Sequence, residues 1–222
     1  MIRIFTPLLI FSISILNVIG QKTIAVSIED RNLAIRQTKE ATAAIKNENY
    51  DIALDKLQKS IEKDSTYREA YLQLYQVGNK NLNNSEAIFQ GLNKGKRIFE
   101  EDDELHFYCG EMYRLNSNFD SALIEYSNAI KYAKTNGEDF YLVPYYYLKR
   151  GNIYLKQEQY QLALNDYNYL LKLDPTSTSG LTNRGTTYFK LGEKDKACQD
   201  WNNAVNNGFV NANAYLKKYC KN

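Results

Sequence analysis

Alanine recurs at a nearly constant interval along this chain of 222 residues. The intervals are 34, 35, 41 and 34 residues, and they separate Ala53, Ala87, Ala122, Ala163 and Ala197. An interval near 34 residues is the length of one helix–turn–helix repeat unit. Such units cannot bury their apolar faces alone, so they stack on their neighbours into a continuous core. The spacing therefore predicts an array of paired helices.

The clearest copy of the unit lies between residues 147 and 175. Its first half is YLKRGNIY (147–154), its second half is YQLALNDY (160–167), and it closes with LDP (173–175). Gly151 and Ala163 are small, so two antiparallel helices can approach closely between them while the tyrosines fill the space around the crossing. The second helix is expected to end at the closing proline, which cannot continue a helix and disfavours α geometry just before it.

This order of a large residue, Gly, Tyr, a turn, and then aromatic, Ala, aromatic and Pro resembles the tetratricopeptide repeat (TPR) consensus. The resemblance implies an all-α fold, a right-handed α-solenoid of helix–turn–helix repeats. A capping helix is expected at its C-terminal end, because the last repeat would otherwise expose a packing face. No β-sheet is expected. The predicted parts are a signal peptide at 1–20, a linker at 21–33, repeats at 34–67, 68–102, 103–143, 144–177 and 178–211, and the cap at 212–222.

The second copy departs from the pattern. Tyr75 stands where Gly is expected, and Gly91 replaces the aromatic residue that should follow Ala87. Its helices are therefore expected to cross differently or to pack more loosely. The 41-residue interval follows the third copy, where residues 135–139 are expected to lie in a longer link.

The first residues have the features of a secretory signal peptide of an exported bacterial protein. An apolar stretch at 4–16 follows a positive residue, and cleavage is expected between Gly20 and Gln21. This stretch is shorter than the roughly 20 residues that a membrane-spanning helix needs. Asp30 is a candidate N-cap of the first mature helix. An uncleaved N-terminal anchor is the open alternative.

Export changes the expected state of the cysteines. Cys198 and Cys220 are equidistant from Phe209, which falls in the loop between two antiparallel helices. A disulfide is therefore feasible, and an oxidising compartment would preserve it. Two buried thiols are the alternative. The segment 197–220 also resembles the ending of many exported bacterial TPR proteins. Cys109 is expected to be a core residue.

Little in the sequence points to chemistry. The single histidine, His106, leaves almost no material for His-based metal sites or catalytic pairs. The three cysteines have no zinc or CxxC spacing, and no Gly-rich phosphate loop occurs. The acidic run at 100–104 is best explained as the start of a helix, where carboxylates are favoured. A net charge of +2 shows no bias towards nucleic acid. We expect no catalytic residue, cofactor, metal, nucleic acid or small-molecule substrate, and therefore no enzyme.

In the TPR family, the first helix of each repeat lines a concave groove. The resemblance implies a groove that mixes aromatic and hydrogen-bonding groups, which suits an extended peptide or a partner helix. Some TPR domains bind a C-terminal carboxylate, and Asn152 and Asn183 stand at similar places, but Leu148 replaces the lysine of that clamp. The implied groove residues are Leu72, Gln76, Glu104, Phe107, Glu111, Arg114, Tyr145, Leu148, Asn152, Lys156, Thr182, Thr186, Phe189 and Lys190.

The leading hypothesis is an exported scaffold, in the periplasm or the cell envelope. Its groove would bind a protein or peptide partner in envelope assembly, secretion or maintenance. One alternative is a structural or membrane-associated assembly subunit that acts by self-association or through an uncleaved N-terminal anchor. Another is an enzyme or carbohydrate-binding protein that uses the aromatic groove. Membrane association is expected only through the N-terminal segment.

Overall fold

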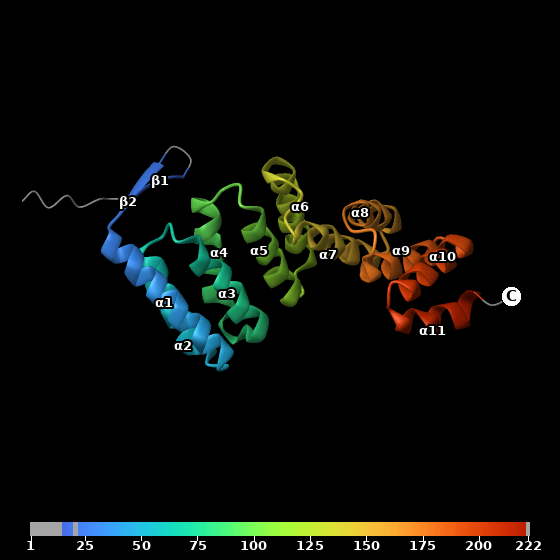
Figure 1. The fold of residues 1–222 in the computed structure, drawn as a ribbon, viewed down its shortest axis with the longest axis horizontal. Helices are drawn as coiled ribbons and strands as arrows, with labels where there is room; N and C mark the ends of the chain where they lie inside the picture. The colour runs from blue at the N-terminus through green and yellow to red at the C-terminus, as the bar shows by residue number, and fades with distance from the viewer. Residues whose placement is uncertain (1–14, 20–21, 221–222) are drawn as a thin grey trace, which may run out of the picture. The chain divides into compact units, whose positions relative to one another are not determined.

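The computed structural model describes residues 15–19 and 22–220, which are mostly helical (Figure 1). The predicted signal peptide lies largely outside these residues, and so does its cleavage site at Gly20 and Gln21. Within the described part of the chain, no helix is long and apolar enough to cross a membrane. The chain divides into two compact units, one ending at Glu100 and the other beginning at Glu101.

The first unit begins with a β-hairpin, which corrects the expectation that the chain has no sheet. Strands β1 (Ile15–Ile19) and β2 (Lys22–Val26) pair antiparallel, with Ile15 opposite Val26. Both strands are rich in β-branched residues, which favour extended backbone.

The first helix starts earlier than the repeat pattern indicates. Helix α1 (Ile28–Lys46) begins ahead of residue 34, so the predicted linker at 21–33 is instead part strand and part helix. The N-cap is Ser27 rather than Asp30, because the Ser27 hydroxyl accepts a hydrogen bond from the backbone N–H of Asp30 at 3.0 Å. Asp30 lies in the first helical turn, where its negative charge interacts favourably with the positive end of the helix dipole.

Together with α1, the remaining elements of the first unit form two antiparallel helix pairs, the first helix with the second and the third with the fourth. These elements are α2 (Tyr50–Lys63), α3 (Arg68–Lys80), the short 3₁₀ helix η1 (Leu82–Asn84) and α4 (Ser85–Ile98). Helix α2 packs on α1, and α4 packs on α3. Ala41 of α1 and Ala53 and Leu57 of α2 are completely buried between the first two helices.

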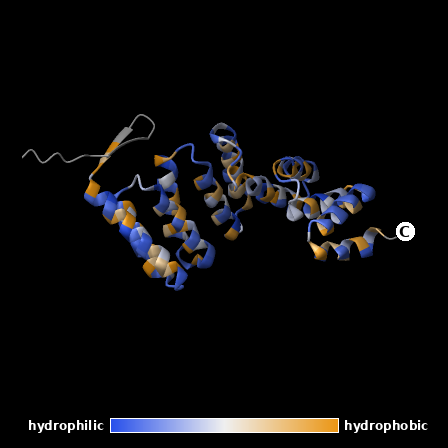
Figure 2. Cartoon of the chain, in the orientation of Figure 1, coloured by the Kyte–Doolittle hydropathy of each residue, from blue (hydrophilic) through white to orange (hydrophobic). Residues whose placement is uncertain are grey.

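The second unit contains three consecutive helix pairs. They are α5 (Asp103–Leu115) with α6 (Phe119–Asn136), α7 (Val143–Lys156) with α8 (Tyr160–Leu173), and α9 (Thr178–Lys190) with α10 (Lys194–Asn206). Each helix packs on the next one in the chain (Figure 1). Figure 2 shows hydrophobic and hydrophilic residues interleaved along these helices, as expected where one face is buried. The predicted all-α fold class of helix–turn–helix repeats is confirmed.

The helices of a pair approach most closely where a glycine faces a ring. In α5, a Cβ atom added at Gly110 would lie 2.6 Å from the ring of Tyr126. The same relation holds for Gly151 with Tyr167 at 2.9 Å, and a Cβ at Gly185 would lie 2.8 Å from Trp201. Real Cβ contacts are almost never shorter than 3.0 Å, so any larger residue would push the helices apart. The alanines Ala122, Ala163 and Ala197 are completely buried at the same crossings.

The second repeat uses a different register from the one that the alanine spacing indicates. Ala87 is only half-buried, whereas its neighbour Ile88 is completely buried. Four residues further on, Leu92 is also completely buried, so Leu92 occupies the place assigned to Gly91. The glycine-to-ring contact is reversed as well, because Gly95 of α4 approaches Tyr71 of α3, where an added Cβ would lie 2.8 Å from the ring.

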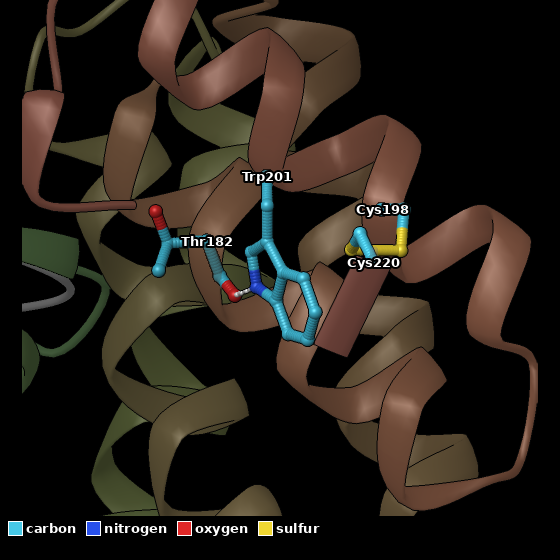
Figure 3. The surroundings of a disulfide bond; sticks show 4 residues. All are labelled: Thr182, Cys198, Trp201 and Cys220. Carbon is cyan, nitrogen blue, oxygen red and sulfur yellow. Dashed lines mark hydrogen bonds between the residues drawn. A yellow bond between two sulfur atoms is a disulfide. The ribbon is translucent and has the colours of Figure 1, made fainter. Parts of the chain in front are cut away.

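The predicted capping helix covers the end of the last repeat, and its geometry changes along its length. Its consecutive parts are the 3₁₀ helix η2 (Val210–Ala212), α11 (Asn213–Tyr215) and a π-helical turn, η3 (Leu216–Cys220). A disulfide joins Cys198 of α10 to Cys220 (Figure 3). Trp201 donates a hydrogen bond to the backbone carbonyl of Thr182 at 3.2 Å. Its ring lies 5.1 Å from that of Tyr215 and 5.9 Å from that of Tyr219.

Substituting Ala163→Leu should destabilise the α7–α8 crossing. Ala163 is completely buried, and a larger side chain there would force the two helices apart. We expect a loss of about 1–3 kcal/mol in the free energy of unfolding, measured by chemical denaturation. Leu162→Ala is the matched control because the neighbouring Leu162 is 45% exposed. Equal stability of Ala163→Leu and the natural protein would contradict this account of the crossing.

Removing the disulfide should loosen the C-terminal pieces. A cross-link over a sequence separation of 22 residues is worth about 3 kcal/mol in the loop-entropy account. We therefore expect Cys198→Ala with Cys220→Ala to lower the thermal midpoint, and reductant to lower that of the natural protein but not that of the double variant. Indifference of the natural protein to reductant would show that the bond contributes no stability.

Candidate functional site

The structure places the predicted groove residues at very different depths. In the first unit, Leu72 is buried and Gln76 is half-buried on α3. In the second unit, Tyr145, Lys156 and Lys190 are exposed on α7 and α9. The partly buried members are Arg114, Asn152, Thr186 and Phe189, and the buried ones are Glu104, Phe107, Glu111, Leu148 and Thr182.

Phe107 belongs to the core of the second unit. It is 5% exposed, and its ring lies 4.8 Å from that of Tyr146 and 5.9 Å from that of Tyr126. A partner therefore cannot use this ring as an anchor without repacking the core. Tyr145, by contrast, is a 49% exposed aromatic side chain of α7.

One hollow lies beside Tyr145 and has a volume of about 270 Å³. Leu148 and Leu170 give it an apolar part, while the segment before α9 gives it hydroxyl groups. Two of these hydroxyl groups already bond within the chain: Asp174 Oδ1 accepts from the hydroxyl of Thr176 at 2.8 Å, and the Ser177 hydroxyl caps α9. This hollow therefore combines hydroxyl groups with a smaller apolar surface, beside the exposed ring of Tyr145.

A buried carboxylate organises the polar part of α5 and α7. Glu111, which is 3% exposed, accepts two hydrogen bonds from Arg114 at 2.9 Å and one from Lys149 Nζ at 3.1 Å. The hydroxyl of Tyr126 also donates to it. Burial raises the pKa of Glu111, but the hydrogen bond from Arg114, the charge of Lys149 and the hydroxyl of Tyr126 together bring this pKa below its ordinary value.

The two asparagines that resemble clamp residues are bonded to each other. Asn152 Oδ1 accepts from Asn183 Nδ2 at 2.8 Å and from the hydroxyl of Tyr167 at 2.8 Å. Since two donors meet at this oxygen, the side-chain amide of Asn152 is oriented with its nitrogen away from them. Asn183 uses a side-chain N–H donor for this hydrogen bond within the protein.

A second hollow, which we call the basic hollow, has a volume of about 290 Å³. Its cationic side chains are Arg114, Lys149 and Lys156, and Asn152 adds an amide. Phe119 and Ile153 supply its apolar part, and Lys156 Nζ lies 4.0 Å from the centre of the Phe119 ring. The structure thus brings together three residues of the predicted groove, Arg114, Asn152 and Lys156, and adds three that the prediction omitted, Phe119, Lys149 and Ile153.

Sequence reasoning missed the ion pairs inside the fourth and fifth repeats. Arg150 makes two hydrogen bonds to Asp166, at 2.9 and 2.6 Å. Arg184 binds Asp200 in the same way, at 2.7 Å for both bonds, and this raises the pKa of Arg184. The sequence does carry a signal for these pairs: in both repeats an Arg directly precedes the repeat glycine, and an Asp directly precedes the aromatic residue of the second helix. Both pairs join the two helices of one repeat, so they are structural.

His106 is also structural. Its Nδ1 atom lies 2.7 Å from Glu125 Oε2 on the paired helix, and its ring lies 5.2 Å from that of Tyr132. Among the described residues, no group of three or more His, Cys, Asp or Glu side chains could hold a metal ion. At the start of α5, Asp102 accepts a hydrogen bond from the N–H of Leu105, so this part of the acidic run caps a helix.

Comparisons with known proteins agree with this architecture. A family model described as TPR repeat matches residues 151–192. The chain is 34% identical to the Hsp70-Hsp90 organizing protein of Triticum aestivum over 58 residues, which are 26% of this chain and only 10% of that protein. The structure resembles YrrB, "a TPR protein with an unusual peptide-binding site", with a TM-score of 0.62, 20% identity and coverage of 86% of this chain and 95% of YrrB.

A second solved structure, that of pilF of Pseudomonas aeruginosa, matches with a TM-score of 0.67 and 13% identity over 81% of this chain and 78% of pilF. At such identities the likeness concerns the fold alone. The helix pairs with their small residues and rings define a helical repeat protein. More narrowly, residues 151–192 match the tetratricopeptide repeat family model, and the chain is similar to tetratricopeptide repeat proteins.

Acid should weaken the Glu111 cluster. Because its pKa is lowered in the folded state, the Glu111 carboxylate stabilises the fold above its ordinary pKa of 4.5, and this contribution is lost as the pH falls below that value. We expect Glu111→Gln to cost about 1–3 kcal/mol at neutral pH and to reduce the further loss of stability in acid. Chemical denaturation of the natural protein and the variant, at neutral pH and at a pH below 4.5, measures these differences in stability.

Glu158→Gln is a suitable control because Glu158 lies exposed in the turn after α7. A Glu111→Gln variant with the same acid sensitivity as the natural protein would contradict the proposed role of this carboxylate.

Proposed function

We propose that this protein is an exported scaffold that binds a protein partner along the exposed face of α7, within the second unit. The observation that carries the proposal is that both hollows open along one stripe of this helix. Tyr145 and Leu148 line the first hollow, and Asn152 and Lys156 line the basic hollow. These positions are three or four residues apart, so they lie on the same helical face.

The chemistry of this stripe suits an extended peptide or a helix better than a small substrate. An exposed aromatic side chain is a typical anchor of protein interfaces, and donors spaced along a helix would set the register of a bound segment. YrrB shares the fold, and its described peptide-binding site supports a binding role by analogy. The described residues that line the stripe include no pair of groups arranged for acid–base or nucleophilic chemistry.

We further propose that the protein works in the cell envelope, in assembly, secretion or maintenance. The N-terminal sequence has the features of a signal peptide, and the disulfide between Cys198 and Cys220 requires an oxidising compartment to persist. The fold likeness to pilF and to PilW, a structure described as a "type IV pilus biogenesis factor", supports this setting by analogy.

Photo-crosslinking in intact cells tests the proposal. Photoreactive groups would replace Tyr145 and Lys156 on the stripe, and Ile124 of α6, which is 62% exposed, would serve as the control position. One protein recovered from both stripe positions and absent from the control would support the scaffold. Crosslinks only to a second copy of the chain would instead indicate an assembly subunit, and export would be tested by whether the mature N-terminus is residue 21.

Tyr145→Ala should weaken partner binding without unfolding the protein. Half of the side chain is exposed, so its removal costs little core packing but removes an aromatic anchor. We expect a change in stability within about 0.5 kcal/mol and a loss of binding energy above about 1 kcal/mol. Affinity for the crosslinked partner and a thermal melt measure both. A strongly destabilised variant would place Tyr145 in the core instead.

A further inference from the structure

We infer that the basic hollow receives the side-chain carboxylate of an acidic segment within the partner. This inference rests on the proposed function and specifies what part of a partner the second hollow recognises. Its ligand is a glutamate or aspartate inside a chain, not a chain end.

The charge of the hollow is not cancelled by the protein itself. Arg114 and Lys149 share one carboxylate, that of Glu111, which is buried beside them. Lys156 is exposed, and its ammonium group lies over the ring of Phe119. None of the residues that line the hollow, all of which are described, carries a carboxylate. Three cations therefore face one buried anion, and the lining has room for a further negative charge.

The hydrogen-bonding groups of the hollow are donors. The guanidinium of Arg114 and the two ammonium groups have no acceptor atoms. Asn152 would add an acceptor, but its oxygen is occupied by Asn183 and Tyr167. Its nitrogen, a donor, makes no hydrogen bond within the described part of the chain and is left for a ligand. A site with this inventory accepts an oxyanion and disfavours a cation or a donor group.

The apolar part of the lining selects among oxyanions. Phe119 and Ile153 present hydrocarbon surface in the same hollow. A glutamate side chain would place its methylene groups on this surface and its carboxylate on the donors. A bare inorganic anion would leave the surface uncovered. Arg114 and Lys149 are already held in place by Glu111, so part of the ordering cost of binding is met before the ligand arrives.

The full-length mature protein can be tested with a fluorescent glutamate-rich peptide that is acetylated and amidated at its ends. We expect binding that weakens with salt and that disappears for the matched glutamine-rich peptide. Lys156→Gln should weaken binding about three- to fivefold, the size expected for one exposed charge pair. Lys46→Gln is the control, because Lys46 lies in the last turn of α1 as Lys156 does in α7, its substitution removes the same charge, and Lys46 does not line the hollow.

Equal binding of both peptides, or an unchanged affinity of folded Lys156→Gln, would overturn the inference. Binding only when the peptide has a free C-terminal carboxylate would overturn it too, because the ligand would then be a chain end. If Lys156→Gln still captures the crosslinked partner while no acidic peptide binds, the inference fails and the proposed function stands. If the acidic peptide binds but no partner is found in cells, the proposed function fails and the chemistry of the hollow stands.

Discussion

The contact between a small residue on the first helix and a ring on the second helix is the constraint on which each repeat of the second unit depends. At Gly110, Gly151 and Gly185 there is no room for a Cβ atom, so the backbone itself lies against the ring. This contact fixes both the distance of the first helix and its rotation. Because the glycine face of α7 must point inwards, Tyr145 and Lys156 are carried to the outside. The exposed stripe of α7, along which we propose that a partner binds, is thus a consequence of the packing.

Polar groups beside the crossing add specificity more than stability. The Arg150–Asp166 and Arg184–Asp200 pairs are each mostly buried, and the desolvation of two charges offsets much of their attraction. Their geometry is nevertheless demanding, since two parallel hydrogen bonds form only in one register of the helices. In the third repeat, Glu111 binds cations from α5 and α7 instead. Its carboxylate therefore joins neighbouring repeats and shapes the hollow that a partner would enter.

The sequence was sufficient to predict the class of fold, because the repeat glycines, alanines and rings are local signals with a clear physical reason. The repeat pattern was misleading where the adjacent residue in the sequence, rather than the expected one, is buried at the helix crossing. Ile88 replaces Ala87 in the second repeat, since an apolar residue one position away can fill the same crossing when the turn is longer. The site was harder to predict, because burial depends on packing between repeats. Phe107 is therefore a core ring, and Phe119 lines the basic hollow from an unexpected helix.

The end of the last repeat shows how the same packing creates a need for a cap. Trp201 faces the glycine of its own repeat on one side, and the segment after α10 covers its outer surface. The segment that covers it is helical from Val210 to Cys220, but a single helix of this length is marginal on its own in water. Stacking of Tyr215 and Tyr219 on the indole and the bond from Cys198 to Cys220 supply what helix formation cannot. Because a disulfide persists in an oxidising compartment, this cap is most stable there, which is consistent with the proposed location in the cell envelope.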